Sequence, residues 1–212
     1  MRIAKEALPY SIFLLLVSAI SYSFSTIVFI IVILCLSFVI FFFRNPNRKI
    51  DYNDNYVLSP ADGRIQAIST IKNNYYEGEA IKISIFLSLF NVHINRSPVQ
   101  GIIRGTSYRP GKYLPAFKSH ASELNERNTV IVENNKIKVV VHQITGFIAR
   151  RIVCYKKEGD LVSQGEIFGL IKFGSCTEII VPSDIELFVK EGDRVQAGKT
   201  VMGEVKNDKK QC

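Results

Sequence analysis

The stretches "EGDLVSQGEIFGLIK" (residues 158–172) and "EGDRVQAGKTVMGEVK" (residues 191–206) are two copies of one pattern. Each copy begins with Glu-Gly-Asp, has a Val two residues later, and has a Gly three residues after that Val. Glycine adopts positive φ without a steric penalty, so each copy predicts a turn, a short strand, a second bend at Gly and a further strand. Two such copies predict a quasi-symmetric β unit.

The repeat resembles the flattened barrel of biotinyl and lipoyl domains. We therefore predict a mainly β fold, a flattened barrel or barrel-sandwich domain with an internal hairpin repeat. A carrier of this type presents a modified lysine midway between the two copies, but the chain has no lysine between Lys172 and Lys190. Gly174, Ser175 and Cys176 occupy that midpoint. A non-enzymatic, membrane-tethered lipoyl-like module, either a carrier or an adaptor, remains the alternative.

The rest of residues 51–212 also has the pattern of a β domain. The stretch "TVIVENNKIKVVVHQI" (residues 129–144) consists of two runs rich in branched residues, with Asn134-Asn135 between them. Asn is favoured in the tight turns that join antiparallel strands, so this stretch predicts a hairpin. No helical period of ten residues is present in this part of the chain.

Residues 1–50 differ sharply from the rest, because Tyr10–Phe43 is almost free of charge. The apolar run divides at "SYSFST" (residues 21–26), which predicts a hydrophobic helical hairpin that anchors the protein, with two membrane spans. A signal peptide is disfavoured because the run is too long and no small-residue cleavage site follows it. Basic residues flank the hairpin on both sides and predict that the following domain faces the cytoplasm at the cell membrane; they are Arg2, Lys5, Arg44, Arg48 and Lys49.

The formal net charge of +8 raises the question of a nucleic-acid partner. The basic residues are scattered through predicted strands, and no basic run is interleaved with stacking aromatic residues, so nucleic acid is disfavoured. An anionic membrane surface is the favoured partner. The four cysteines and three histidines of the chain show no metal-ligand spacing, and we predict no metal.

The Gly174-Ser175 dipeptide interrupts a stretch that otherwise reads as a strand. Gly-Ser is common in turns and by itself predicts a β-bulge. The same dipeptide also suits an N-to-O acyl shift, because the Ser hydroxyl can attack the unshielded carbonyl of the preceding Gly. Elimination and hydrolysis would then leave a pyruvoyl group, an electrophilic ketone that accepts the electrons released by decarboxylation of an amine substrate.

Five separated blocks decide between these interpretations: "SPADGRI" (residues 59–65), "FLSLFNVHINRSPVQG" (86–101), the residues of "Y…PAF…ASELNERN" (113–128), "QITGFIARRIV" (143–153) and "FGSC" (173–176). Together they resemble the short prokaryotic form of phosphatidylserine decarboxylase, in the same order over residues 55–206. The resemblance implies a pyruvoyl-dependent enzyme that makes phosphatidylethanolamine from phosphatidylserine. It further implies self-cleavage between Gly174 and Ser175, with the two fragments remaining together as a heterodimer.

The resemblance also implies roles for individual residues. Ser175 would become the pyruvoyl group and form a Schiff base with the phospholipid substrate. His93 matches a histidine associated with proton transfer, and Asp62 matches an acidic residue that helps to activate the serine. Which of Asp62, His93 and His142 activates Ser175 stays open. Arg127 could hold the substrate carboxylate or phosphate through its guanidinium, or it could pair with a nearby glutamate.

Cys176 departs from the pattern of this family, which more often has Arg, Ser or Thr after the serine. A thiol could drive an N-to-S shift, which would cut the bond between Ser175 and Cys176. The less hindered carbonyl of Gly174 favours cleavage before Ser175.

Overall fold

The computed structural model describes residues 2–112, 114, 124–146, 151–172 and 175–205. The chain forms two compact units, Met1–Asn47 and Arg48–Cys212. Gly174, on one side of the predicted cleavage site, lies outside the described residues.

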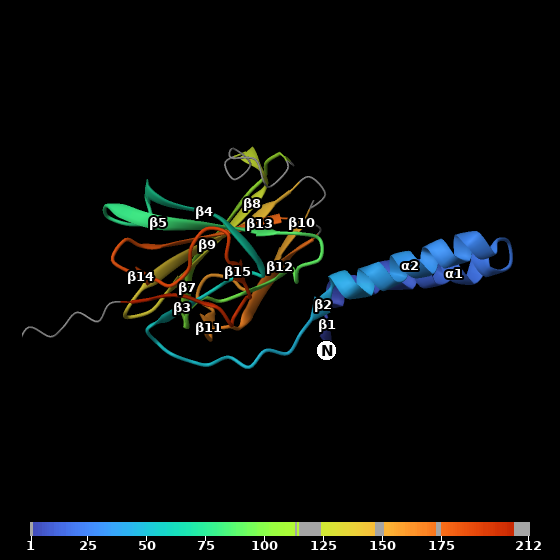
Figure 1. Cartoon of the computed structure of the whole chain (residues 1–212), viewed down its shortest axis with the longest axis horizontal. Coiled ribbons are helices and arrows are strands. Elements are labelled where there is room, and N and C mark those ends of the chain that lie inside the picture. The colour runs from blue at the N-terminus through green and yellow to red at the C-terminus, as the bar shows by residue number, and fades with distance from the viewer. Residues whose placement is uncertain (1, 113, 115–123, 147–150, 173–174, 206–212) are drawn as a thin grey trace, which may run out of the picture. The chain divides into compact units, whose positions relative to one another are not determined.

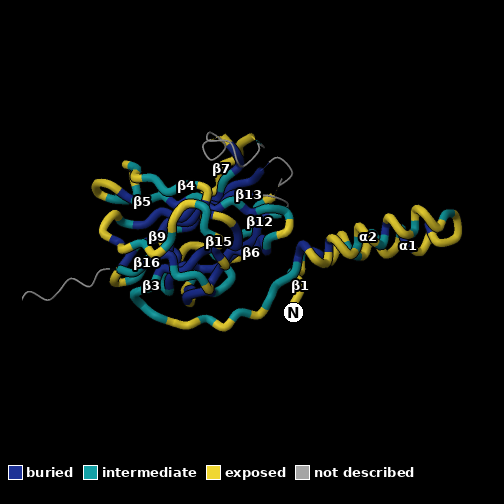
Figure 2. Tube along the Cα trace, viewed as in Figure 1, coloured by how far each residue is buried: buried dark blue, intermediate teal, exposed yellow. Residues whose placement is uncertain are grey.

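The N-terminal unit is a helical hairpin, as its apolar pattern predicts (Figure 1). Its elements are β1 (Arg2–Ile3), a 3-10 turn at Lys5–Ala7, α1 (Leu8–Tyr22), α2 (Thr26–Phe42) and β2 (Arg44–Asn45), and β1 pairs with β2. The break falls within the predicted "SYSFST" stretch, because the Ser25 hydroxyl accepts a hydrogen bond from the Val28 amide and caps α2. Many residues of the hairpin are exposed (Figure 2), and large apolar residues are among them. Among the described residues, neither helix has both the length and the apolar character needed to cross a membrane.

The second unit is mainly β and is built on an eight-stranded antiparallel sheet that curls into a half-barrel (Figure 1). In sheet order its strands are β11 (Leu161–Val162), β7 (Gly101–Arg109), β8 (Arg127–Glu133), β9 (Lys138–Thr145), β13 (Ser175–Pro182), β5 (Glu79–Leu87), β4 (Gly63–Lys72) and β15 (Arg194–Val195). Two three-stranded sheets complete the unit. They are β10 (Arg151–Cys154), β12 (Ile167–Lys172) and β6 (Ile94–Arg96), and β14 (Glu186–Leu187), β16 (Val201–Glu204) and β3 (Tyr56–Leu58).

The strand order is symmetric about the β9–β13 pair. A pseudo-two-fold relates β11, β7, β8 and β9 to β15, β4, β5 and β13, and it relates one three-stranded sheet to the other. The irregularities obey the same relation. The register shifts between Ile65 and Ala67 in β4 and between Ile103 and Gly105 in β7, and β12 and β16 also share a shift at equivalent points. The quasi-symmetric unit predicted from the repeat is therefore present.

Each copy of the repeat forms a short strand followed by a longer one, β11 and β12 in the first and β15 and β16 in the second. All four turn glycines have positive φ, with values of 89° at Gly159, 75° at Gly165, 91° at Gly192 and 69° at Gly198. The two copies also dock in the same way. The Gly159 amide donates to the Ile103 carbonyl at 2.9 Å, and the Gly192 amide donates to the Ile65 carbonyl at 2.8 Å.

The symmetry extends to a second repeated pattern, Ser-Pro-x-x-Gly, at residues 59–63 and 97–101. In each copy the serine hydroxyl donates to a backbone carbonyl two residues later, at 2.8 Å from Ser59 and 2.6 Å from Ser97. The copies also bond across the pseudo-axis, since the Arg96 amide donates to the Pro60 carbonyl and the Leu58 amide to the Pro98 carbonyl. The loops before β4 and β7 are therefore fixed by equivalent bonds.

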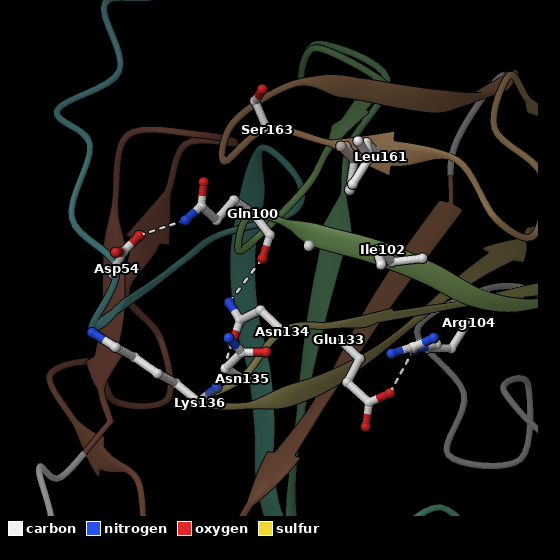
Figure 3. A pocket seen from close by; sticks show the side chains of 12 residues that line it. Asp54, Gln100, Ile102, Arg104, Glu133, Asn134, Asn135, Lys136, Leu161 and Ser163 are labelled. Atoms are coloured by element: carbon white, nitrogen blue, oxygen red, sulfur yellow. Dashed lines mark hydrogen bonds and ion pairs between the residues drawn. The ribbon is translucent and has the colours of Figure 1, made fainter.

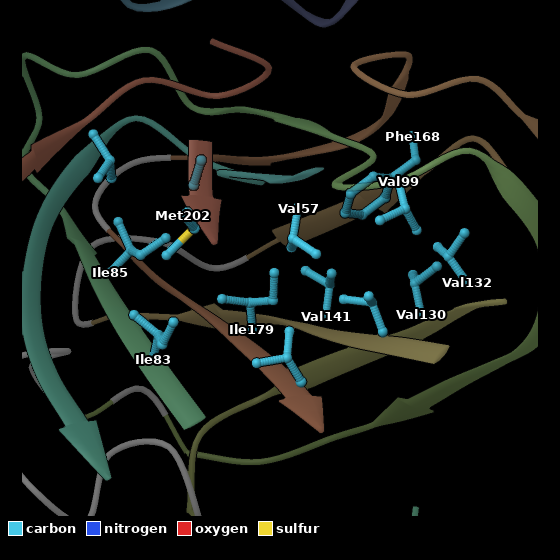
Figure 4. Close-up of a cluster of buried hydrophobic side chains, with 14 of the residues drawn as sticks. Val57, Ile83, Ile85, Val99, Val130, Val132, Val141, Phe168, Ile179 and Met202 are labelled. Carbon is cyan, nitrogen blue, oxygen red and sulfur yellow. The ribbon is translucent and has the colours of Figure 1, made fainter. Parts of the chain in front are cut away.

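The core lies between the curled sheet and the two smaller sheets (Figure 4). It is filled mainly by Val and Ile, whose branched side chains suit alternating positions on strands. In β13, for example, Ile179 and Val181 point into this core. The predicted hairpin is confirmed, because β8 and β9 pair along their whole length and the Asn134 amide donates to the Ile137 carbonyl at 3.0 Å to close the turn.

Candidate functional site

Ser175 is the first residue of β13 and is paired on one side with Leu87 and on the other with Thr145. It is fully buried, and within the described part of the chain its hydroxyl has no hydrogen-bond partner. An unsatisfied buried polar group costs about 1–3 kcal/mol. Most buried hydroxyls have a partner, so an exception of this kind calls for an explanation and is often functional.

The sheet register brings the other predicted site residues to the end of the strands where Ser175 lies. One row across the sheet runs through Arg64, Phe86, Cys176, Ile144 and Arg127. Because each pair in this row is antiparallel, β4, β8 and β13 run in the same direction and begin at the same end of the sheet. Asp62 immediately precedes β4, and His93 follows the end of β5 in the next loop. This end of the sheet therefore brings together four segments that are far apart in sequence.

His93 is almost fully buried in the loop that follows β5. Its Nδ1 lies 3.0 Å from the Asn91 carbonyl oxygen, a contact that requires Nδ1 to carry the proton. In the tautomer with the proton on Nδ1, Nε2 is the acceptor nitrogen, which is the form a general base needs. The His93 carbonyl accepts a hydrogen bond from the Ile171 amide at 3.1 Å, so this loop is fastened to β12 four residues before Ser175.

Asp62 is held at the start of β4 by a buried ion pair. Its carboxylate accepts two hydrogen bonds from the guanidinium of Arg48, at 2.6 and 2.7 Å, and one from the Ala197 amide at 2.8 Å. Arg48 also donates to the Ala197 carbonyl. The strand that follows Asp62, β4, is separated from β13 by β5 alone, which corresponds to about 10 Å between the two strands. This geometry makes Asp62 an anchor for the loop beside the site.

Arg127 begins β8 and lies opposite Arg109 on one side and Ile144 on the other. Its Nε is buried and has no hydrogen-bond partner in the part of the chain that the structure describes. Burial lowers the pKa of Arg127, and the neighbouring Arg109 lowers it further. A partly buried cation with a spare donor, next to a second cation, is suited to binding an anion.

Alternation along β13 places the side chains of Ser175 and Cys176 on opposite faces of the sheet. Ser175 shares its face with Thr177 and the core, whereas Cys176 shares the outer face with Glu178. Burial raises the pKa of the Cys176 thiol, and the charge of Glu178 raises it further. The thiol is therefore protonated and a poor nucleophile.

His142 also lies on the outer face, because it is paired directly with Glu178. Its Nδ1 is 3.0 Å from the Thr129 hydroxyl, and its ring packs against Tyr75. Burial lowers the pKa of His142 to about 3, and the cations Arg127, Lys82 and Arg109 contribute to this shift. Of the two histidines considered for activating Ser175, His142 has its side chain on the face away from the serine side chain.

A cavity of about 670 Å³ lies at the opposite end of the sheet, where β8 ends at Glu133 (Figure 3). Its lining includes two interactions between side chains, from Gln100 to Asp54 at 2.7 Å and from Arg104 to Glu133 at 2.9 Å. The six residue steps along β8 from Arg127 to Glu133 separate the two ends by roughly 20 Å. The pseudo-two-fold relates the end of the sheet that holds this cavity to the end where Ser175 lies.

Sequence reasoning missed two features of the site. Arg48, which binds Asp62, gave no sequence signal, because a single arginine in a basic linker is unremarkable. The repeated Ser-Pro-x-x-Gly pattern was detectable and would have identified Asp62 as the counterpart of Gln100. In the described ranges, no group of three or more His, Cys, Asp or Glu side chains could hold a metal ion.

Comparison with known proteins gives a consistent result. A family model described as phosphatidylserine decarboxylase matches residues 35–203. The phosphatidylserine decarboxylase proenzyme of Carboxydothermus hydrogenoformans is 52% identical over 179 residues, which cover 84% of each chain. The proenzyme of the same name from Geotalea uraniireducens is 46% identical over 78% of each chain. That of Desulfotalea psychrophila is 41% identical over 96% of each chain.

Proposed function

The chain belongs to the phosphatidylserine decarboxylase family, and from this premise we propose that it makes its own pyruvoyl cofactor by cutting itself between Gly174 and Ser175. The reaction it catalyses is the decarboxylation of phosphatidylserine to phosphatidylethanolamine. The observation that carries the self-cleavage proposal is the buried Ser175 hydroxyl, which has no hydrogen-bond partner among the described residues and begins a central strand of the sheet.

In the first step the Ser175 Oγ attacks the carbonyl carbon of Gly174. The peptide C–N bond breaks, an ester to the serine oxygen forms, and the Ser175 nitrogen becomes a free amine. Loss of the Ser175 α-proton then expels the ester oxygen, which leaves Gly174 with a carboxylate and residue 175 as dehydroalanine. Water hydrolyses the imine tautomer, releases ammonia and leaves a ketone at the new N-terminus. The ketone would supply an electron sink for the electron pair that stays with the rest of the substrate when the carboxylate leaves as carbon dioxide.

His93 is the group we assign to proton transfer. Its neutral ring, with Nδ1 donating to the Asn91 carbonyl, presents Nε2 as the basic nitrogen. The fastening of the His93 carbonyl to Ile171 supports this role, because it ties the histidine to the segment that leads into the cleavage site. The same nitrogen, once protonated, can return a proton to the substrate carbon after carbon dioxide leaves.

Arg127 lies on the outer face of the sheet, as Cys176 does, but it begins β8 at the strand end where Ser175 lies, and we assign it to the anionic headgroup. Its buried Nε has no partner in the described ranges, and Arg109 beside it adds a second positive charge, while Glu178 is the nearby negative charge. A guanidinium can hold a carboxylate or a phosphate through two parallel hydrogen bonds. Phosphatidylserine carries both groups.

The helical hairpin is the part we assign to the membrane. Its exposed apolar side chains suit an acyl environment, and the basic residues beside it suit an anionic cytoplasmic leaflet. We propose that it holds the catalytic unit on the cytoplasmic side of the cell membrane, where the phospholipid substrate is located.

Denaturing electrophoresis with intact-mass measurement tests self-cleavage. The purified protein should give two fragments, residues 1–174 and residues 175–212, and the second should be blocked to Edman sequencing. Ser175→Ala should remain a single chain, since it lacks the attacking oxygen. A cut that persists in Ser175→Ala, or an intact chain in the active native protein, would refute the mechanism. An uncut native chain without decarboxylase activity would favour a non-enzymatic module.

His93→Ala tests the second assignment. We expect decarboxylation of phosphatidylserine to fall by about 10²–10⁴-fold, the usual contribution of a positioned acid or base. His142→Gln is the matched control, because that histidine lies on the other face of the sheet, and it should retain decarboxylation. Equal losses in the two variants would remove the assignment of His93.

A further inference from the structure

A chain of buried polar side chains runs through the interior beside Ser175. The Asn95 amide nitrogen donates to the Thr177 hydroxyl at 3.1 Å, and the Gln143 amide nitrogen donates to the Asn95 side-chain oxygen at 2.9 Å. Asn128 donates in turn to the Gln143 side-chain oxygen at 2.8 Å. All four residues are at least 95% buried, and they come from the four strands β6, β13, β9 and β8. We call these residues the amide network.

The amide network touches every segment that carries a predicted catalytic residue. Thr177 lies two residues after Ser175 and shares its face of β13. Asn95 lies two residues after His93, and it also donates to the Pro60 carbonyl at 3.3 Å, two residues before Asp62. Asn95 is therefore bonded to the strand of Ser175 and to the loop of Asp62, and it sits on the segment of His93.

The pseudo-two-fold provides an internal comparison for the node of this network. Asn95 of β6 lies opposite Gly169, and Val57 of β3 lies opposite Gly203 after an equivalent register shift. Val57 is thus the counterpart of Asn95. It is buried in the hydrophobic core.

The other members also have apolar counterparts. Thr177 lies opposite Ile85, and Ile85 lies opposite Ile65 of β4. In the other half, Val139 lies opposite Val132, and Val132 lies opposite Ile103 of β7. Ile65 and Ile103 are equivalent positions, so Val139 is the counterpart of Thr177. The same relation gives Val181 for Gln143 and Ile81 for Asn128.

One end of the sheet therefore has Val and Ile at these positions, and the other end has Asn, Thr and Gln at the equivalent positions. The fold itself does not require polar residues at these positions. Replacing a buried polar pair by apolar residues of similar shape is often neutral or stabilising, so stability does not account for the amide network. The network is confined to the end of the sheet where Ser175 lies.

We propose that Asn95, through the amide network, is the positioning residue that aligns the segments of Ser175, His93 and Asp62 for cleavage of the Gly174–Ser175 bond. This inference rests on the proposed self-cleavage. The hydrogen bond from Asn95 fixes the position of Thr177 relative to the loop that carries His93. It thereby also fixes the position of the first residues of β13.

Two substitutions at Thr177 separate the effect of the hydrogen bond on positioning from its effect on stability. Thr177→Val keeps the volume and removes the hydroxyl, whereas Thr177→Ser keeps the hydroxyl and removes a buried methyl group. The rate of chain cleavage is followed by denaturing electrophoresis after cell-free synthesis, and thermal unfolding is measured on the same proteins. We expect Thr177→Val to unfold at a lower temperature than the native protein, because one buried Asn95 N–H loses its partner, and to cleave about tenfold more slowly, the effect of one lost hydrogen bond.

Thr177→Ser should also unfold at a lower temperature, because it loses a buried methyl group, but it should cleave faster than Thr177→Val. A purely structural role predicts that cleavage follows stability alone, so that the less thermally stable of the two variants is the slower one even when it is Thr177→Ser, and that two variants of equal stability cleave at the same rate. That result would overturn the proposal.

Asn95→Val, which installs the residue found at the counterpart position, should fold and also cleave slowly. Gln164→Ala is the matched control, because Gln164 is a buried amide with hydrogen bonds to Asn53 and Tyr56 and its counterpart in the second repeat is Ala197. This variant should cleave at the native rate. Slow cleavage in Gln164→Ala, or native cleavage in Asn95→Val, would contradict the positioning role. The native chain is assayed in parallel, and its failure to cleave would count against the self-cleavage proposal.

Discussion

Ser175 and Cys176 are adjacent in sequence, but they occupy different chemical environments because a strand alternates its side chains. The serine hydroxyl faces the interior, without a partner among the described residues, and the cysteine thiol faces the outer side next to Glu178. The two potential nucleophiles are therefore distinguished by one step along β13.

Cys176→Ser tests this distinction at the residue scale. We expect the cut to remain between Gly174 and Ser175, since the native thiol is held protonated by burial and takes no part. Intact-mass measurement of both fragments decides the matter. A shift of the cut by one residue in the native protein, abolished by Cys176→Ser, would show that the thiol is the nucleophile.

His142 makes a prediction about pH. Its pKa is lowered from 6.5 to about 3 in the folded state by burial and by Arg127, Lys82 and Arg109, while Glu178 is its cross-strand neighbour. The unfolded chain binds this proton near pH 6.5 and the folded chain does not. Stability from this residue is therefore fully present above pH 6.5 and is lost as the pH falls toward 3, with a slope of up to about 1.4 kcal/mol per pH unit.

Chemical denaturation at pH values between 7 and 4 measures this dependence. His142→Gln should reduce the slope of the free energy of unfolding against pH by up to about 1.4 kcal/mol per pH unit, which corresponds to the uptake of one proton on unfolding. Parallel curves for the native protein and the variant would mean that His142 has an ordinary pKa in the fold.

At the scale of elements, the contact between β12 and the large sheet depends on the absence of a side chain at Gly169. A Cβ there would lie 2.4 Å from the Val153 carbonyl oxygen and 2.8 Å from the Gln143 amide nitrogen. β12 therefore approaches the amide network more closely than any other residue type allows.

Gly169→Ala should lower the free energy of unfolding by about 1–3 kcal/mol, the usual effect of overpacking. Gly105→Ala is the matched control, since Gly105 also lies in a strand and its added Cβ would meet only an ordinary contact of 3.7 Å with Ile131. Denaturant titration compares the two variants. Similar stabilities would show that β12 can move away from β10 and β9 at little cost.

The elements could be predicted where the signal was local. The Gly residues of the repeat required positive φ, and the Asn134 turn joined two branched runs, so these elements were found from sequence. The amide network could not be found in this way, because Asn95, Gln143 and Thr177 are single polar residues on three strands whose register only the folded sheet defines. Asp62 was predicted as an activator of the serine, and its ion pair with Arg48 depended on a contact across the fold.

At the scale of the whole molecule, the site is one end of a pseudo-symmetric unit whose two ends have diverged. The end near Ser175 has a polar interior, and the other end has an apolar interior and the cavity beside Gln100. The sequence repeat predicted the symmetry but not the difference, since the repeat itself contains none of the residues of the amide network.

The position of β13 predicts how the cleaved protein behaves. β13 lies between β5 and β9 and pairs with both, over eight residues with β5 and six with β9. The fragment of residues 175–212 should therefore remain bound to residues 1–174 as a heterodimer. Size-exclusion chromatography in native buffer should give one peak that contains both fragments, and they should separate in guanidinium chloride. Recovery of the small fragment alone from native buffer would contradict this prediction.

The central position of β13 also bears on when the cofactor can appear. The pairs that hold Ser175 against Leu87 and Thr145 join residues 30 or more apart along the chain, so they exist only after the sheet has formed. Under the proposed self-cleavage, a misfolded copy cannot acquire the reactive ketone. Maturation then works as a form of quality control, because the cell obtains the electrophile only from molecules whose fold is complete.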